Sequence, residues 1–208
     1  MPVIARKNLI KLIRNGDLAV SPILSKKQIG SCSIDLRMGN VAAIVRARGL
    51  SHVDPKAYMA ANTEHKKEKE KRQKLDKHEI PFGEALLLHP GTLTLVPTFE
   101  WVKLPYNLQG VVTARSSWAR EGLNIATASF INPEYTGIIT LELANLGQIP
   151  IALYPGMRIA QIAFYSINLG EEDNKDIVHS QFDMAFEPEM GDIAKKDDDY
   201  FTDDTDTH

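Results

Sequence analysis

Apolar residues follow two different spacings along the chain. Between Arg6 and Asn15 they recur at the spacing of one helix face, and Gly16 follows as a stop signal, so residues 6–15 are predicted to form a short amphipathic helix. Beyond it, short apolar segments alternate with turns rich in Pro, Gly and Asn, at a spacing of roughly ten residues that is typical of consecutive strands. The predicted strands are 33–36, 41–45, 85–88, 92–96, 110–113, 138–143, 151–153 and 158–164.

This succession of short strands predicts a mainly β fold. A parallel α/β sheet needs helical segments of roughly 10–15 residues between its strands, and the sequence between residues 80 and 167 has none. We therefore expect an all-β barrel or a jelly-roll-like sandwich that occupies residues 1–170, with the short helix at its N-terminal end.

Two polar segments interrupt or follow the predicted strands. Residues 61–79 carry the densest charge in the chain, and glutamates are interleaved with the lysines. We interpret this segment as part of an insertion of about residues 55–79, a solvated helix or an excursion from the sheet, because a nucleic-acid patch would carry less negative charge. Residues 171–208 are acidic and polar, and we expect them to form a C-terminal lid or tail.

Composition narrows the function classes. The 208 residues are 43% hydrophobic, enough for one sizeable core, and the formal net charge of -3 argues against a protein that binds long nucleic acid through its phosphates. Cys32 is the single cysteine, which excludes an intramolecular disulfide and any zinc site that needs two thiolates from one chain. We find no signal-peptide core and no apolar segment near the roughly 18 residues of a membrane span, so we expect a cytoplasmic protein without membrane contact.

The hexapeptide from Arg115 to Arg120, RSSWAR, is a candidate phosphate-binding motif. Two arginines enclose two serines directly after a predicted strand. Guanidinium groups and serine hydroxyls are natural donors to phosphate oxygens. The alternative from these residues alone is a serine-capped helix with two surface arginines.

Glu142 is a candidate catalytic carboxylate. It lies between Leu141 and Leu143 in a predicted strand, so it points away from both and shares a face with Thr140 and Ala144. A carboxylate in largely apolar surroundings has a raised pKa, which suits a general base. Taken alone, the pattern favours a solvent-facing glutamate on a half-exposed sheet over a catalytic one.

Four segments together resemble the dCTP deaminase family of the dCTP deaminase/dUTPase superfamily. They are GSCSIDLRMGN, which carries Asp35, PFGEALLLHPGTLTLVPTFEWVKLP, RSSWAREGL and ASFINPEYTGIITLELANLGQIPIALYPGMRIAQIAF. They occur in the family's order between about residues 6 and 167, and the charged insertion is the one interruption. The resemblance implies a distorted β-barrel of the dUTPase type, a homotrimer with active sites at subunit boundaries, and zinc-free hydrolysis of dCTP to dUTP and ammonia.

The resemblance also implies roles for particular residues. Glu142 is the catalytic base, and Ser116 and Arg120 assist around the reacting cytosine. No metal ligand is implied in the protein, because Mg2+ enters with the triphosphate. The predicted substrate-binding residues are Arg115, Ser116, Ser117, Trp118, Ala119, Arg120, Ala128, Asn132, Thr140, Leu141 and Gln161.

The chain departs from the family pattern in three places. Asn132 replaces a usual aspartate, and an amide cannot serve as the base that would drive diphosphate hydrolysis. Trp118 replaces a smaller aliphatic residue, and the tail lacks the family's closing motif. Gln161, in contrast, resembles the bifunctional branch that converts dCTP to dUMP. The alternatives to dUTP formation are therefore a bifunctional deaminase and diphosphatase, a dUTPase, or a nucleotide-binding regulatory protein, with dTTP as a candidate inhibitor.

Overall fold

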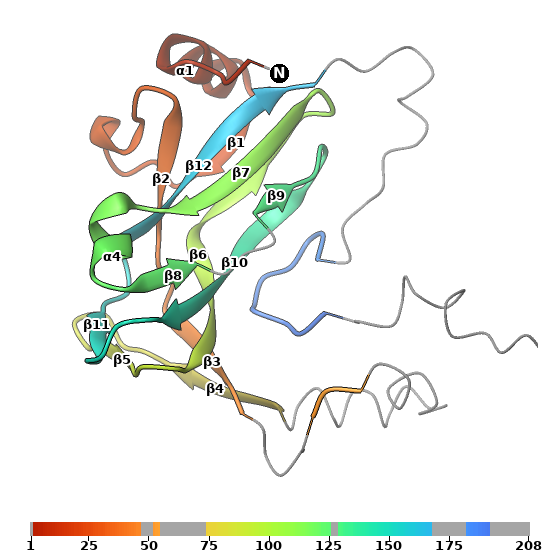
Figure 1. Ribbon diagram of the computed structural model, residues 1–208. Helices are drawn as coiled ribbons and strands as arrows, with labels where there is room; N and C mark the ends of the chain where they lie inside the picture. The colour runs from red at the N-terminus through yellow and green to blue at the C-terminus, as the bar shows by residue number, and fades with distance from the viewer. Residues whose placement is uncertain (1, 47–51, 55–73, 126–128, 168–181, 192–208) are drawn as a thin grey trace, which may run out of the picture.

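The strands form two larger antiparallel sheets and one small one (Figure 1). The computed structural model describes residues 2–46, 52–54, 74–125, 129–167 and 182–191. The larger sheets have the strand orders β4-β3-β6-β10-β8, with β1 also paired to β6, and β2-β12-β7-β9, whereas β5 and β11 pair with each other. This architecture confirms the prediction of a mainly β, jelly-roll-like fold, and no single sheet closes on itself among the described residues.

The helical elements are short. They are α1 (Arg6–Asn15), the 3-10 turn η1 (Lys26–Gln28) and α4 (Ser116–Arg120). The strands are β1 (Ala19–Ser21), β2 (Ser33–Arg37), β3 (Val41–Val45), β4 (Leu75–Glu79), β5 (Leu86–Leu88), β6 (Leu93–Lys103), β7 (Leu108–Ala114), β8 (Leu123–Ile125), β9 (Phe130–Ile131), β10 (Thr136–Asn145), β11 (Ile151–Leu153) and β12 (Arg158–Ser166).

The predicted N-terminal helix is confirmed at both ends. It stops at Gly16, whose φ of 79° is left-handed and whose N–H donates to the carbonyl of Ile13. Leu9 is fully buried and fixes the apolar face of α1 against the β domain. No helix within the described ranges is long and apolar enough to cross a membrane.

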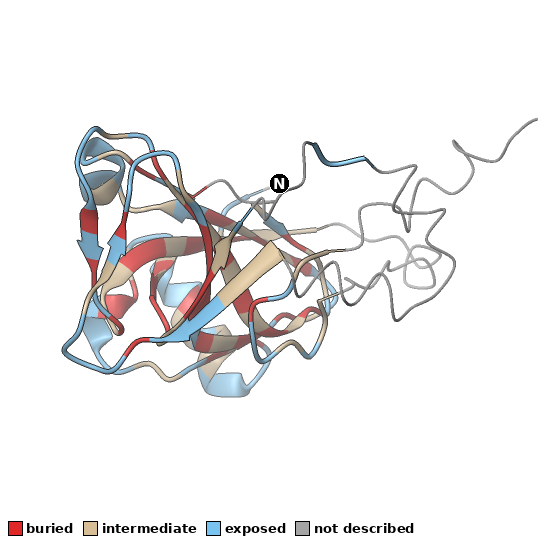
Figure 2. Ribbon diagram, turned by 90° about the horizontal axis from the view of Figure 1, so that it is seen from below, coloured by how far each residue is buried: buried red, intermediate tan, exposed pale blue. Residues whose placement is uncertain are grey.

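Both larger sheets contribute to one core, which appears as the buried band in Figure 2. Leu141 and Leu143 of β10 come from one sheet, and Ile162 and Phe164 of β12 come from the other; all four are 0% exposed. Each of these pairs is separated by one residue, as expected for strands with one face buried.

The chain passes from one larger sheet to the other at Gly39. The predicted strands on either side of it are present, but β2 pairs with β12 whereas β3 pairs with β6 and β4. A Cβ at Gly39 would lie 2.9 Å from Cγ of Pro97 and 3.0 Å from its carbonyl oxygen, so only glycine fits this approach.

Strand β6 continues beyond the predicted end at Val96. Proline interrupts most central strands, but here the pairing of β10 with β6 shifts register between Ile138 and Thr140, opposite Pro97. Thr98 compensates, because its hydroxyl oxygen accepts the N–H of Ile139 at 2.9 Å. A local irregularity therefore allows one long strand where the sequence indicated a break.

The end of the charged segment is a strand. Residues 75–79 form β4 and pair with β3 along its whole length, so the interpretation of 61–79 as a helix or an excursion is wrong for these five residues. The strand was missed because it shows no alternation of apolar and polar residues. It lies at the edge of the sheet, and most of its residues are polar. The rest of the predicted insertion, 55–73, lies outside the described residues.

Part of the predicted tail packs on the β domain. Met184 donates its N–H to the carbonyl of Thr136 at 2.7 Å, and Ile138 donates to the carbonyl of Ala185 at 3.2 Å. Lys77 of β4 and Glu187 form an exposed ion pair at 3.0 Å. The segment 182–191 therefore follows the edge of β10 and reaches β4.

Candidate active site

A polar strip crosses the outer face of the sheet β2-β12-β7. Gln161 of β12 is in register with Asp35 on one side and Thr113 on the other. Its amide donates to the hydroxyl of Thr113 at 3.3 Å, and its side-chain oxygen accepts the hydroxyl of Ser33 at 3.4 Å. Gln161 is thereby held in one orientation on the half-exposed face of three strands.

Arg115 joins this strip at the end of β7. Its Nε lies 3.4 Å from Oδ1 of Asp35, and Oδ2 of the same carboxylate lies 3.1 Å from Nη1 of Arg158. The Asp35 side chain is 15% exposed, whereas those of Arg115 and Arg158 are 34% and 39% exposed. The carboxylate is therefore mostly covered, and the two guanidinium groups reach the surface.

The arginine–serine motif forms α4. Its N-cap is Arg115, and no side chain caps it, so the alternative interpretation of a serine-capped helix is not supported. The exposed residues of the motif are Ser116, Ser117, Ala119 and Arg120. They are available to a ligand, in agreement with a binding role rather than a capping role.

Trp118 faces the protein rather than the solvent. Its ring packs against the core, and its indole N–H donates to the carbonyl oxygen of Arg158 at 3.2 Å. The indole N–H is therefore already bonded within the chain. The predicted contact of Trp118 with a substrate can use only the part of the ring that remains exposed.

Glu142 occupies the position that strand alternation predicts. It lies on the half-buried face of β10 with Thr140 and Ala144, opposite to the fully buried Leu141. Its neighbour across β6 is Leu95, which is 5% exposed, so the carboxylate has an apolar side chain beside it.

Within the described residues, the edge of β10 near Glu142 is only partly paired. Strand β8 covers Leu143–Asn145, and the segment around Met184 bonds Thr136 and Ile138. Alternate residues of a strand present their peptide groups to the same edge, so Thr140 and Glu142 face this edge between the two partners. Leu141 presents its backbone to β6 and its side chain to the core, so its predicted substrate contact has no side-chain route.

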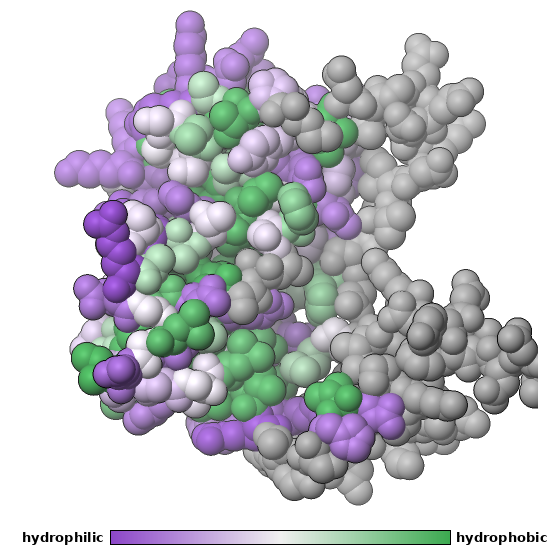
Figure 3. Space-filling model, in the orientation of Figure 1, coloured by the Kyte–Doolittle hydropathy of each residue, from purple (hydrophilic) through white to green (hydrophobic). Residues whose placement is uncertain are grey.

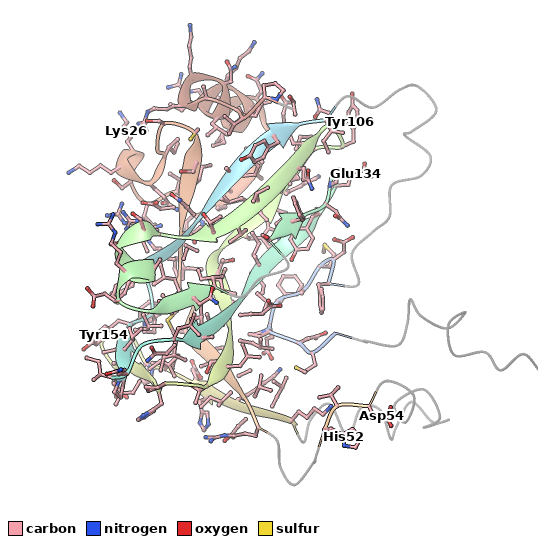
Figure 4. All side chains as sticks on the ribbon, in the orientation of Figure 1. Lys26, His52, Asp54, Tyr106, Glu134 and Tyr154 are labelled. Atoms are coloured by element: carbon pink, nitrogen blue, oxygen red, sulfur yellow. The ribbon has the colours of Figure 1, made fainter. Side chains whose placement is uncertain are left out.

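Asn132 lies in the turn between β9 and β10. It is half-buried, and its carbonyl oxygen accepts the N–H of Tyr135 at 3.3 Å. Figure 4 shows Glu134 of this turn at the same end of the molecule as Tyr106, whereas Tyr154 marks the opposite end. Ala128, predicted to help position the water, lies outside the described residues.

The structure divides the predicted site residues into two groups. Arg115 and Gln161 belong to the sheet β2-β12-β7-β9, and Thr140 and Glu142 belong to the other large sheet. In Figure 1 β8 lies between α4 and β10. A ligand of nucleotide size has phosphates at one end and a base at the other. The group with Arg115 suits the phosphates, and the group with Glu142 suits the base.

Sequence reasoning missed Arg158 and gave Asp35 no role. Both lie inside the segments that carry the family resemblance, but only the fold brings β2, β7 and β12 together at these positions. Metal ligands were not predicted, and no group of three or more His, Cys, Asp or Glu residues is placed to hold a metal ion in the described ranges.

Comparisons with known proteins identify the family. The sequence model described as dCTP deaminase-like matches residues 3–167. A relative from Dictyoglomus thermophilum named "dCTP deaminase, dUMP-forming" is 36% identical over 168 residues, 80% of this chain and 81% of the relative. A relative from Pectobacterium atrosepticum named "dCTP deaminase" is 38% identical over 154 residues, 72% of this chain and 76% of the relative.

A solved structure supports the fold. The 2'-deoxycytidine 5'-triphosphate deaminase from Agrobacterium tumefaciens is 23% identical to this chain and superimposes with a TM-score of 0.58, covering 84% of this chain and 51% of that chain. With a family match over most of its length and relatives above 30% identity, this chain belongs to the dCTP deaminase-like family.

Proposed function

We propose that this protein catalyses the hydrolytic deamination of dCTP, with Glu142 as the base that takes a proton from water. The observation that carries the proposal is the position of Glu142. It projects from the half-buried face of β10 beside Leu95, at a position where no other described strand pairs with the outer edge of β10. A base on this face can act on a planar ring that hydrogen-bonds along the same strand.

The reaction needs one water and returns one ammonia. Glu142 removes a proton from the water while the water oxygen forms a bond to C4 of cytosine. The protonated carboxyl then returns the proton to the amino nitrogen, and the C4–N bond breaks to release ammonia. The remaining hydroxyl proton moves from the C4 oxygen to N3, which leaves uracil. A single carboxylate that acts first as base and then as acid is sufficient for this sequence.

The phosphates are assigned to the residues of the Arg115–Arg120 motif, called here the arginine group. Arg115 and Ser117 bind the triphosphate, and Ser116 and Arg120 act nearer to the base. The exposure of both serines and Arg120, and the half-exposure of Arg115, support these roles. Mg2+ would enter with the substrate, held by the oxygens of its triphosphate.

A homotrimer would bring the two groups of site residues together across a subunit boundary. Exposed apolar side chains support assembly: Leu146 and Ile149, after β10, are 73% and 75% exposed, and Leu87 of β5 is 56% exposed. Figure 3 shows hydrophobic surface below β8 and β10 on the face drawn. Apolar patches of this kind are typical of surfaces that bind another protein chain.

A second candidate function is continued hydrolysis to dUMP. The name of the Dictyoglomus relative, a dUMP-forming dCTP deaminase, favours it, and so does Gln161, which is fixed on the same strip as Arg115. Asn132 opposes it, because an amide cannot activate water for attack on phosphate. We therefore propose dUTP as the main product and dUMP as the alternative.

One assay separates the candidate functions. The full chain is incubated with dCTP or dUTP and Mg2+, and the products are resolved by anion-exchange chromatography. Ammonia and dUTP from dCTP support the proposal, whereas dUMP and pyrophosphate from dCTP support the bifunctional alternative. Pyrophosphate from dUTP alone would indicate a dUTPase. Nucleotide binding without turnover would indicate a regulatory protein, and adding dTTP tests inhibition in the same assay.

A further inference from the structure

One carboxylate holds two arginines on the outer face of the sheet β2-β12-β7. Each oxygen of Asp35 has its own partner, Nε of Arg115 at 3.4 Å and Nη1 of Arg158 at 3.1 Å. Two guanidinium groups share one negative charge, so this surface keeps a net positive charge. Because both groups are about one-third exposed, that charge is accessible to an anion.

The backbone of Arg158 is fastened to α4. Its carbonyl oxygen accepts Nη1 of Arg115 at 3.4 Å and the indole N–H of Trp118 at 3.2 Å. The N–H of Arg115 donates to the carbonyl of Ile159 at 3.0 Å. Trp118, a departure from the family pattern, therefore ties the arginine–serine motif to the first residues of β12.

A buried network fixes Asp35 from inside. The Gln28 amide donates to the backbone carbonyl of Asp35 at 3.0 Å and to the carboxylate of Glu100 at 2.8 Å. Arg37, two residues along β2, binds Glu100 through both its N–H and its Nη1 at 2.7 Å. Burial raises the pKa of Glu100, and the bonds from Arg37 act against this rise. The backbone is thus anchored in the core at Asp35 and, two residues further along β2, at Arg37.

We propose that Arg158 is a phosphate-binding residue that acts together with Arg115, and that Asp35 is a positioning residue that orients the pair. The proposal rests on the proposed function, in which Arg115 binds the triphosphate. Asp35 engages Nε of Arg115 and Nη1 of Arg158. A guanidinium group has five N–H donors, and the contacts with Asp35 and with the carbonyl of Arg158 engage only some of them, so donors remain for phosphate oxygens.

The ligand chemistry is the polyphosphate of a nucleoside triphosphate. A triphosphate carries more negative charge than Arg115 and Arg120 neutralise, and Arg158 supplies a third guanidinium on the same strip. Gln161 is in register with Asp35 of β2 and with Thr113 of β7, so the strip is continuous across the three strands. A nucleoside monophosphate lacks the outer phosphates and should depend much less on Arg158.

The test compares two ligands in one background. The full chain carrying Glu142→Gln is titrated calorimetrically with dCTP and with dCMP in the presence of Mg2+. Arg158→Ala in this background should weaken dCTP binding by about tenfold or more, as expected for a lost charge-assisted bond, and leave dCMP binding within about twofold. Asp35→Asn, which keeps the shape but not the charge, should shift the ratio of the two affinities in the same direction.

Controls separate this proposal from a general loss of charge or of fold. Arg14→Ala removes an exposed arginine of α1, far from β12 in the chain, and should leave both affinities unchanged. Arg158→Lys should recover part of the preference for dCTP, because it keeps the charge without the fork. Equal losses for dCTP and dCMP in Arg158→Ala, or an unchanged dCTP affinity, would overturn the proposal. Failure of the parent Glu142→Gln chain to bind dCTP would instead count against the proposed function.

Discussion

Met184 donates its backbone N–H to the carbonyl oxygen of Thr136 at 2.7 Å, on the edge of β10 that also carries Glu142. Two residues along the same edge, Ile138 donates to the carbonyl of Ala185 at 3.2 Å. Gly137 permits this close approach, because a Cβ there would lie 3.3 Å from backbone atoms of Ala185. The C-terminal segment thus borders the proposed base-binding edge, and its two hydrogen bonds hold the start of β10 in place.

The first prediction concerns the conformation of Met184. Its φ of 61° is left-handed, a region that β-branched residues rarely occupy and that glycine occupies freely. Met184→Val should therefore weaken docking of this segment by about 1–2 kcal/mol, and Met184→Gly should preserve or strengthen it. Hydrogen exchange at the amide of Ile138 measures the docking directly, and should become faster in the valine variant.

The side chain of Met184 is 57% exposed, so little packing is lost in either variant. Met190→Val serves as a control at a position outside the two bonds. Equal exchange rates at Ile138 in Met184→Val and the unchanged protein would show that the segment does not protect this edge.

The second prediction concerns catalysis by Glu142. Glu142→Gln keeps the size of the side chain but cannot take a proton from water, so ammonia release from dCTP should fall by at least about a thousandfold. Nucleotide binding should remain within about tenfold, because the arginine group is unchanged. Glu84→Gln, on an exposed turn residue, is the matched control and should keep full activity. Full activity in Glu142→Gln would remove the carboxylate from the mechanism.

Much of the fold could be predicted because local spacing sets it. Apolar spacing and Gly16 define α1, and alternation in β10 places Leu141 in the core and Glu142 on the other face. These features depend on neighbours in the sequence. The long strand β6 could not be predicted, because its continuity past Pro97 depends on the hydroxyl of Thr98 and a register shift in β10.

Asp35 and Arg158 could not be assigned to the site from the sequence for a different reason. Asp35 of β2 and Arg158 of β12 are far apart in the sequence, and the sheet brings both beside Arg115, which directly follows β7. The buried pair of Arg37 and Glu100 has the same origin, and nothing in the local pattern marked either residue as buried. Such clusters depend on sheet order, which residue spacing alone does not determine.

The third prediction is a pH dependence of stability from Tyr135. Burial, and to a lesser extent the charge of Asp183, raises the pKa of Tyr135 to about 12 from 10.0. Between these values the unfolded chain loses the phenol proton while the folded chain keeps it, so the free energy of unfolding falls as pH rises. The full difference corresponds to about 3 kcal/mol.

Urea unfolding at pH 9 to 11 of the unchanged protein and of Tyr135→Phe measures this effect. The phenylalanine variant also loses the bond that the phenol donates to the carbonyl of Ile138, so it should be less stable by about 1 kcal/mol at pH 9. The gap should narrow and then reverse as pH rises. Tyr106→Phe, at a half-exposed tyrosine, should show no such change. A gap that stays constant with pH would contradict the raised pKa.

The fourth prediction concerns the product, and it depends on Asn132. An aspartate at this position could activate water for attack on phosphate, whereas the amide can only hydrogen-bond. Asn132→Asp should therefore raise the share of dUMP and pyrophosphate formed from dCTP, with ammonia release changed by less than about tenfold. The variant is nearly isosteric and the turn is held by the backbone bond to Tyr135, so the site should keep its shape. Asn124→Asp on β8, an exposed asparagine, adds the same charge away from this turn and should leave the product unchanged. If the dUMP share does not rise in Asn132→Asp, then the asparagine is not what limits phosphate hydrolysis, and the limit lies elsewhere in the site.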